Sequence, residues 1–156
     1  HVVNELDVPI LVMGGQDLIV AASPEGILVA DKAASSHMKP YVERMHQPVM
    51  FAEKSWGSFR IIDVEEGSLT IKVTLNAGHA MNYHSHERRR EIWTLVSGSG
   101  TVLLDGEERA VAAGDVIEIP VGMKHKISAR ERMVVIEVQI GADIVKEDKI
   151  KWSEEV

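Results

Sequence analysis

The sequence of 156 residues contains no cysteine, and this absence limits its chemistry. Disulfides, cysteine nucleophiles and thiolate metal sites are all excluded. A chain without cysteine fits a reducing compartment, and we expect a cytoplasmic protein. Any bound metal must therefore be held by histidine, aspartate or glutamate side chains.

Long apolar runs and an excess of positive charge are missing as well. The longest nearly apolar stretch, residues 8–15, is far shorter than the roughly 20 residues that a membrane-spanning helix needs. The N-terminus lacks the basic and then apolar segments of a secretory signal. The formal net charge is −7, whereas proteins that bind nucleic-acid backbones are normally basic. We therefore expect neither a membrane nor a nucleic acid as a partner. A small phosphosugar substrate is still compatible with this charge, because a few local lysines or arginines are enough to bind it.

The first 46 residues differ in pattern from the rest and predict a small appendage of strands and a helix. Three short apolar runs, separated by turn residues, predict three strands in a meander, at residues 8–13, 18–22 and 27–30. Asp31 then predicts the cap of a helix toward Met45, which Pro40 interrupts. Residues 46–48 read as a connector.

Residues 50–145 carry a β pattern and predict the main domain, followed by a C-terminal tail at residues 146–156. Apolar and polar residues alternate over 69–75, as in a half-buried strand, and Asp105-Gly106 indicates a tight hairpin. Further short apolar runs predict strands at residues 92–96, 101–104, 116–119, 126–128 and 134–140. So many short, closely spaced strands indicate an all-β sandwich or barrel.

A cluster of metal-ligand residue types lies at the start of this β region. His84 and His86 are two positions apart, so on a strand they point to the same face, ~7 Å apart along the backbone. Glu91 follows after an odd step, so a turn through residues 87–90 must bring it back to that face. Glu91 then opens an apolar strand, which is a rigid place for a ligand.

A second cluster ends in another histidine. Gly114 begins a turn, residues 116–119 form a strand, and Pro120-Val121-Gly122 redirects the chain. His125 then starts the next strand, where it can face the first cluster.

These two clusters resemble the two motifs of the cupin superfamily. The first motif fits at every fixed position from Gly78 to Gly98, and the second fits from Gly114 through His125 but has Ala129 where asparagine is usual. The resemblance implies an all-β fold: a double-stranded β-helix (cupin, jelly-roll) barrel with a small N-terminal strand-and-helix appendage. It also implies that the metal ligands lie inside the barrel and are His84, His86, Glu91 and His125.

A ligand set of three imidazoles and one carboxylate suits a divalent transition metal. Zn is our first candidate, with Fe, Mn, Ni and Cu as alternatives, because affinity alone does not choose among them. Four protein ligands on an octahedral ion leave two positions for substrate oxygens. The alternative is a relic of a metal site in a cupin that has lost its ion.

Further fragments, at residues 56–59, 119–125 and 136–141, resemble the type II phosphomannose isomerase cupin. In many bacteria that cupin is the C-terminal part of a bifunctional mannose-1-phosphate guanylyltransferase/mannose-6-phosphate isomerase. Residues 18–32 resemble the end of the guanylyltransferase region. The family usually has glutamine where this chain has His84, and its C-terminal arginine is absent here. The resemblance implies a metal-dependent isomerase of mannose and GDP-mannose metabolism, and by family analogy a homodimer.

The nucleotide-binding region of the guanylyltransferase has no counterpart in this sequence. No phosphate-cradling helix follows Gly14-Gly15, so we do not expect guanylyl transfer from this chain alone. Because the chain begins at His1, we expect it to be part of a longer polypeptide.

Isomerisation moves a proton between C1 and C2 of the sugar and needs a base and a polarised carbonyl. The catalytic candidates are Lys124 beside His125, Glu137, which shares a strand face with Gln139, and Lys72, which a polar interior would accept. Residues 88–90 are candidates for phosphate binding, against a plain solvated turn. The alternative functions are a non-catalytic metal- or sugar-binding module and another metal-cupin enzyme, such as an oxygenase.

Overall fold

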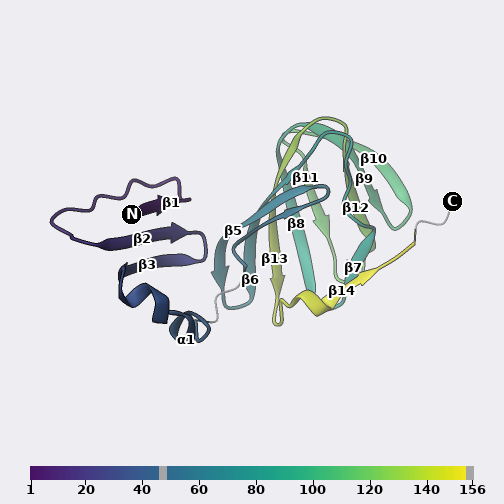
Figure 1. Cartoon of the computed structure of the whole chain (residues 1–156). Helices are drawn as coiled ribbons and strands as arrows, with labels where there is room; N and C mark the ends of the chain where they lie inside the picture. Colours follow the sequence, from purple (N-terminus) through teal and green to yellow (C-terminus); the bar gives the residue numbers. More distant parts are fainter. Residues whose placement is uncertain (46–48, 154–156) are drawn as a thin grey trace. The chain divides into compact units, whose positions relative to one another are not determined.

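A computed structural model describes residues 1–45 and 49–153 of the chain, which divides into two units, His1–Phe51 and Ala52–Val156 (Figure 1). The connector predicted at residues 46–48 and the last three residues of the predicted tail lie outside the described residues. Among the described residues, no helix combines the length and the apolarity that crossing a bilayer requires.

The first unit is built on a three-stranded sheet with the order β1-β2-β3. Strand β1 (Val2–Asn4) runs parallel to β2 (Leu18–Ser23), and β3 (Gly26–Asp31) pairs with β2 antiparallel. The strand predicted at residues 8–13 and the all-antiparallel meander are therefore wrong. A parallel pair needs a crossover of about a dozen residues, and residues 5–17 supply it, so the apolar run lies within a connection.

The helix predicted from Asp31 toward Met45 is split into two short pieces. Asp31 Oδ1 does accept a hydrogen bond, of 2.9 Å, from the Ala34 backbone amide. A 3₁₀ turn, η1 (Ala34–His37), follows, and then α1 (Lys39–Val42), which holds Pro40 in its first turn. Proline is tolerated there because the amide hydrogen it lacks would have no partner within the helix.

The second unit consists of two sheets. The six-stranded sheet has the order β11-β8-β13-β6-β5-β4, and the five-stranded sheet has the order β10-β9-β12-β7-β14. The first comprises β4 (Phe51–Lys54), β5 (Gly57–Glu65), β6 (Ser68–Leu75), β8 (Arg89–Ser97), β11 (Val116–Ile119) and β13 (Met133–Gly141). The second comprises β7 (His84–His86), β9 (Ser99–Leu104), β10 (Glu107–Ala112), β12 (His125–Ala129) and β14 (Lys149–Lys151). The strands predicted in this region are confirmed.

The core of this unit lies between the two sheets. Trp93 and Leu75 from one sheet and Val102 and Ile127 from the other belong to a single buried cluster. The predicted all-β jelly roll is thus confirmed, with one correction. In the described part of the chain the two sheets stay separate and are not joined by hydrogen bonds into a closed barrel.

Two turns show why particular residues occupy them. Asp105 and Gly106 both have positive φ, 46° and 88°, and join β9 to β10 as the predicted tight hairpin. Gly98 has a φ of 85°, and a Cβ at this position would lie 2.4 Å from the Arg132 carbonyl oxygen. Only glycine fits there, so the last fixed position of the first motif has a steric reason.

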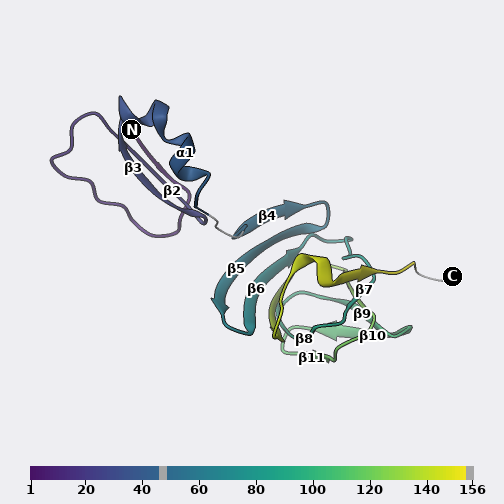
Figure 2. The same ribbon diagram turned by 90° about the horizontal axis from the view of Figure 1, so that it is seen from below.

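The C-terminal segment packs against the second unit. A 3₁₀ turn, η2 (Lys146–Asp148), leads into β14, which pairs antiparallel with β7. Figures 1 and 2 show this segment passing from the end of β13 to the side of β7. The sequence pattern predicted a tail here and missed the strand.

Candidate metal centre

Three histidines converge on the inner face of the five-stranded sheet. His84 and His86 lie on β7, and His125, the first residue of β12, stands directly opposite His84. Residues in these positions have side chains on one face. The ligand atoms of the three imidazoles all lie within 4.8 Å of one another, and all three side chains are buried.

Glu91 reaches the same place from the facing sheet. Its Oε1 lies 3.0 Å from His86 Nε2, and its Oε2 lies 3.5 Å from His125 Nε2. The odd spacing is accommodated because residues 87 and 88 carry the chain from β7 to β8, which belong to different sheets. The structure therefore brings together all four side chains that the motifs singled out.

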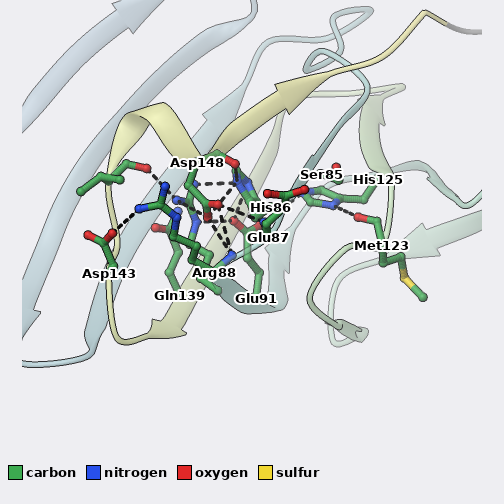
Figure 3. Close-up of polar contacts among 12 residues, drawn as sticks. Ser85, His86, Glu87, Arg88, Glu91, Met123, His125, Gln139, Asp143 and Asp148 are labelled. Atoms are coloured by element: carbon green, nitrogen blue, oxygen red, sulfur yellow. Dashed lines mark hydrogen bonds and ion pairs between the residues drawn. The ribbon is translucent and has the colours of Figure 1, made fainter.

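Backbone carbonyl groups determine which imidazole nitrogen is free. The Nδ1 atoms of His84 and His125 lie 2.6 and 2.9 Å from the carbonyl oxygens of Asn82 and Met123, and Figure 3 shows the second contact. A carbonyl oxygen only accepts hydrogen bonds, so each Nδ1 carries the proton and each Nε2 keeps its lone pair. Such outer partners orient metal-bound histidines and increase their basicity.

The chemistry of these donors fits a divalent transition metal. Within the described residues, His125 Nε2 is buried without a hydrogen-bond partner, which is costly unless another group satisfies it. Burial, followed by the charges of His125 and Lys149, lowers the pKa of His84 to about 3. His84 is therefore neutral at pH 7, in the form that binds metals.

Glu91 supplies the negative charge of the centre. Burial alone would raise its pKa, but the neighbouring imidazoles of His125 and His86 outweigh burial and hold its pKa well below the usual value. Trp93 Nε1 donates a further hydrogen bond of 3.0 Å to Glu91 Oε2. The carboxylate is thus ionised and held in one orientation.

Arg89 has a place at the metal centre that sequence reasoning missed. Its Nη2 lies 3.2 Å from His86 Nε2, and its Nε lies 3.3 Å from Glu91 Oε1. The run of three arginines reads as one polar turn, yet Arg89 is buried whereas Arg88 is exposed and pairs with Asp143. The available signal was parity, because Arg89 and Glu91 are two positions apart on β8.

Asp148 is a second missed residue, and it comes from the C-terminal segment. Its Oδ1 accepts hydrogen bonds from the backbone amides of Glu87 and Arg88, at 3.0 and 3.1 Å (Figure 3). Its backbone carbonyl oxygen lies 3.4 Å from His86 Nδ1, and its Oδ2 lies 3.4 Å from Arg89 Nη1. No sequence signal pointed to Asp148, because 62 positions separate it from His86.

Glu137 lies inside the unit, as its strand face suggested. It is buried, accepts a hydrogen bond from Gln139, and borders an interior gap with apolar side chains such as Val73 and Met81. This gap has no room for a water molecule. Burial, followed by the charge of Glu91, raises the pKa of Glu137 to about 8, so its carboxyl group is largely protonated at neutral pH.

The two lysines proposed for catalysis lie elsewhere. Lys72 is exposed between the buried Ile71 and Val73, so its predicted place in the interior is wrong; the interior there is apolar and would desolvate an ammonium group. Lys124 Nζ lies 4.0 Å from the centroid of the Trp152 ring, whose Nε1 donates to Ser85 Oγ. Ser85 alternates with the two histidines of β7, so its side chain lies on the outer face of that strand. The contact with Trp152 therefore holds the Lys124 ammonium group on the same outer face.

Comparison with known proteins identifies the class of this unit. Residues 71–139 match the family model described as "Cupin domain", and the second unit is therefore a cupin domain. A KdgF structure from Halomonas sp. has a TM-score of 0.52 and 24% identity and covers 60% of this chain and 82% of that chain. An RmlC-like cupin from Shewanella frigidimarina has a TM-score of 0.54 and 20% identity, with coverages of 62% and 85%. These likenesses show the fold.

The relatives in sequence are mannose-1-phosphate guanylyltransferases. The protein of that name from Salmonella montevideo is 27% identical over 151 residues, and the one from Escherichia coli K12 is 25% identical over 154 residues. Each match covers 91% of this chain and 32% of the relative. The chain thus spans about a third of the length of these relatives and is homologous to their C-terminal, cupin-containing region.

Proposed function

We propose that the cupin domain binds a divalent metal through His84, His86, Glu91 and His125 and isomerises mannose 6-phosphate and fructose 6-phosphate. The observation that carries the proposal is the convergence of three buried imidazoles, two of which also lie beside the carboxylate of Glu91. The choice of sugar rests on the resemblance to the type II isomerase and on homology to mannose-1-phosphate guanylyltransferases.

The proposed reaction moves a proton between C1 and C2 of the sugar. A bound divalent ion would supply Lewis acidity toward the sugar oxygens. The guanidinium group of Arg89, buried beside two ligand side chains, is placed to stabilise negative charge that develops on those oxygens. Glu137 holds a proton up to a pH of about 8, which suits a group that exchanges protons with the substrate near neutral pH.

A second function, a non-catalytic metal-binding module, is favoured by one observation. The interior gap beside Glu137 has no room for a water molecule, and Arg89 covers two of the ligand side chains. All four ligand side chains are buried, so a sugar could reach them only if neighbouring side chains moved. A module that holds a metal for structural reasons would need no such movement.

Turnover of mannose 6-phosphate by the metal-loaded protein separates the two functions. We would load the purified protein with Zn, Mn, Co, Ni or Fe, measure bound metal by mass spectrometry, and follow fructose 6-phosphate in a coupled assay. We expect turnover that His86→Ala abolishes and that His37→Ala, an exposed histidine of the first unit, leaves unchanged. Stoichiometric metal without turnover would sink the isomerase and support the non-catalytic module.

A further inference from the structure

Strand β14 places two lysines beside the histidines of the metal centre. Its register sets Lys149 opposite His86 and Lys151 opposite His84. Directly opposite residues of an antiparallel pair have side chains on the same face, with Cβ atoms about 4.5–5.5 Å apart. Both lysines therefore project on the face that carries the imidazoles.

The neighbouring residues of the same segment support this orientation. Ile150 stands opposite Ser85, and Trp152, which has the parity of Ile150, donates a hydrogen bond to Ser85 Oγ at 2.9 Å. The odd and even positions of β14 thus face opposite ways. The segment offers an apolar and aromatic cover to the outer face of β7 and two cations to its inner face.

The charges around Lys149 agree with its place near the centre. Partial burial lowers the pKa of Lys149, the charges of Glu137 and Glu91 oppose this shift, and the like charges of Lys151 and Arg89 add to it. Within residues 1–45 and 49–153, neither Lys149 nor Lys151 forms an ion pair. Both side chains are exposed, so a ligand from solvent can reach them.

We propose that Lys149 and Lys151 bind the phosphate group of an anionic sugar at the edge of the metal centre. Two neighbouring ammonium groups repel each other, and a phosphate dianion removes that repulsion while accepting charge-assisted hydrogen bonds from both. An anion needs local positive charge to bind here, because the chain as a whole has a formal net charge of −7 and would repel it. The sugar itself would extend from the lysines toward the histidines on the same face.

This inference rests on the proposed function for the identity of the sugar, but anion binding can be measured without turnover. The probe is inorganic phosphate, titrated calorimetrically into the metal-loaded protein. The test variant is Lys149→Gln/Lys151→Gln, which keeps the backbone hydrogen bonds of β14. The matched control is Lys54→Gln/Arg109→Gln, which removes two exposed positive charges from strands β4 and β10.

We expect the test variant to weaken phosphate binding about tenfold or more, as for the loss of a charge-assisted hydrogen bond, while its metal content stays unchanged. In the isomerase assay the KM for mannose 6-phosphate should rise more than kcat falls. Phosphate affinity within twofold of the unsubstituted protein, or no measurable phosphate binding by that protein, overturns the inference.

The outcomes for this inference and for the isomerase can be told apart. If mannose 6-phosphate is not turned over but phosphate binding depends on the two lysines, the anion site stands and the isomerase fails. If turnover occurs and the test variant has the same KM as the control, the isomerase stands and the anion site fails.

Discussion

In the first unit, apolar side chains such as Leu11 and Met13 are 83% and 82% exposed, whereas Leu75 and Met133 of the cupin domain are fully buried. Among the described residues of the first unit, only Val20 and Ala22 are buried. The cupin domain buries its apolar residues because two sheets face each other across them. The first unit has one small sheet, and a single sheet cannot bury its apolar face without a second layer.

The two units also differ in what their interiors hold. The cupin domain buries charged or titratable side chains, among them Arg89, Glu91 and Glu137, and the described part of the first unit buries none. Burying such groups is costly unless they are paired or bind an ion. The free-energy cost of burying charged groups is therefore concentrated at the candidate metal centre. Arg89, Glu91 and Glu137 all lie on strands.

The largest expected effect is the loss of stability on truncation of Leu75 in the cupin domain, and Leu11 of the first unit is its matched control. Leu75→Ala leaves a cavity in the core and should lower the free energy of unfolding by about 2–5 kcal/mol. Leu11→Ala should change it by less than about 0.5 kcal/mol, because this side chain is exposed. Urea denaturation followed by tryptophan fluorescence measures both. A large loss in Leu11→Ala would mean that this side chain is buried in the folded protein, and the two units would then not differ in this respect.

Removal of a metal ligand should act on the cupin domain alone. We expect His86→Ala to weaken metal binding by about 100-fold or more, since it removes a ligand rather than an outer partner. Calorimetric titration with Zn measures the affinity. Hydrogen exchange should show metal-dependent protection in residues 52–153 of the unsubstituted protein and none in residues 1–45. Equal affinity in the variant would show that His86 is not a ligand.

Asp148 should couple the C-terminal segment to the metal centre. Asp148→Ala removes the acceptor for the amides of Glu87 and Arg88 and should weaken metal binding about 10–100-fold. Asp148→Asn keeps a side-chain oxygen for these amides and should lose less. Metal titration of both variants, with the Co(II) spectrum as a second measure of ligand geometry, tests this. If both variants bind as the unsubstituted protein does, the segment does not position the centre.

A change in pH dependence should reveal the buried carboxyl group of the cupin domain. The pKa of Glu137 is about 8 in the folded protein against 4.5 ordinarily, so the unfolded chain releases this proton at lower pH. The free energy of unfolding should therefore fall as pH rises from 4.5 to 8, by at most about 1.4 kcal/mol per pH unit. Glu137→Gln should remove this slope in urea denaturation of the metal-free protein. Parallel curves for the two proteins would contradict the assignment.

The sequence predicted the cupin domain better than the first unit, for a physical reason. Residues 69–75 and 116–119 alternate because each strand has one face on a core, and such strands are read correctly. Residues 8–13 are just as apolar but have no core to face, so apolar content alone predicted a strand that does not form.

The histidines and Glu91 could be predicted because strand parity and the spacing of two motifs indicated that they share one site. The fold does bring their side chains together. Arg89 also had a parity signal, but it was hidden in a run of three arginines. Lys72 was misplaced because alternation along a strand does not show whether the opposite face is buried or in solvent. The sequence also did not show which side chain contacts Lys124. Trp152, 28 positions from Lys124, decides where that ammonium group lies.

From the sequence alone we could predict the central strands of the cupin domain, the Asp105-Gly106 hairpin and the four side chains of the metal centre, because these follow from local spacing and alternation. The pairing of the C-terminal segment with β7, which brings Asp148, Lys149 and Lys151 to the histidines, is visible only in the folded structure. Cross-strand register joins residues more than 60 positions apart. Local sequence patterns do not show with which of several strand edges a segment will pair.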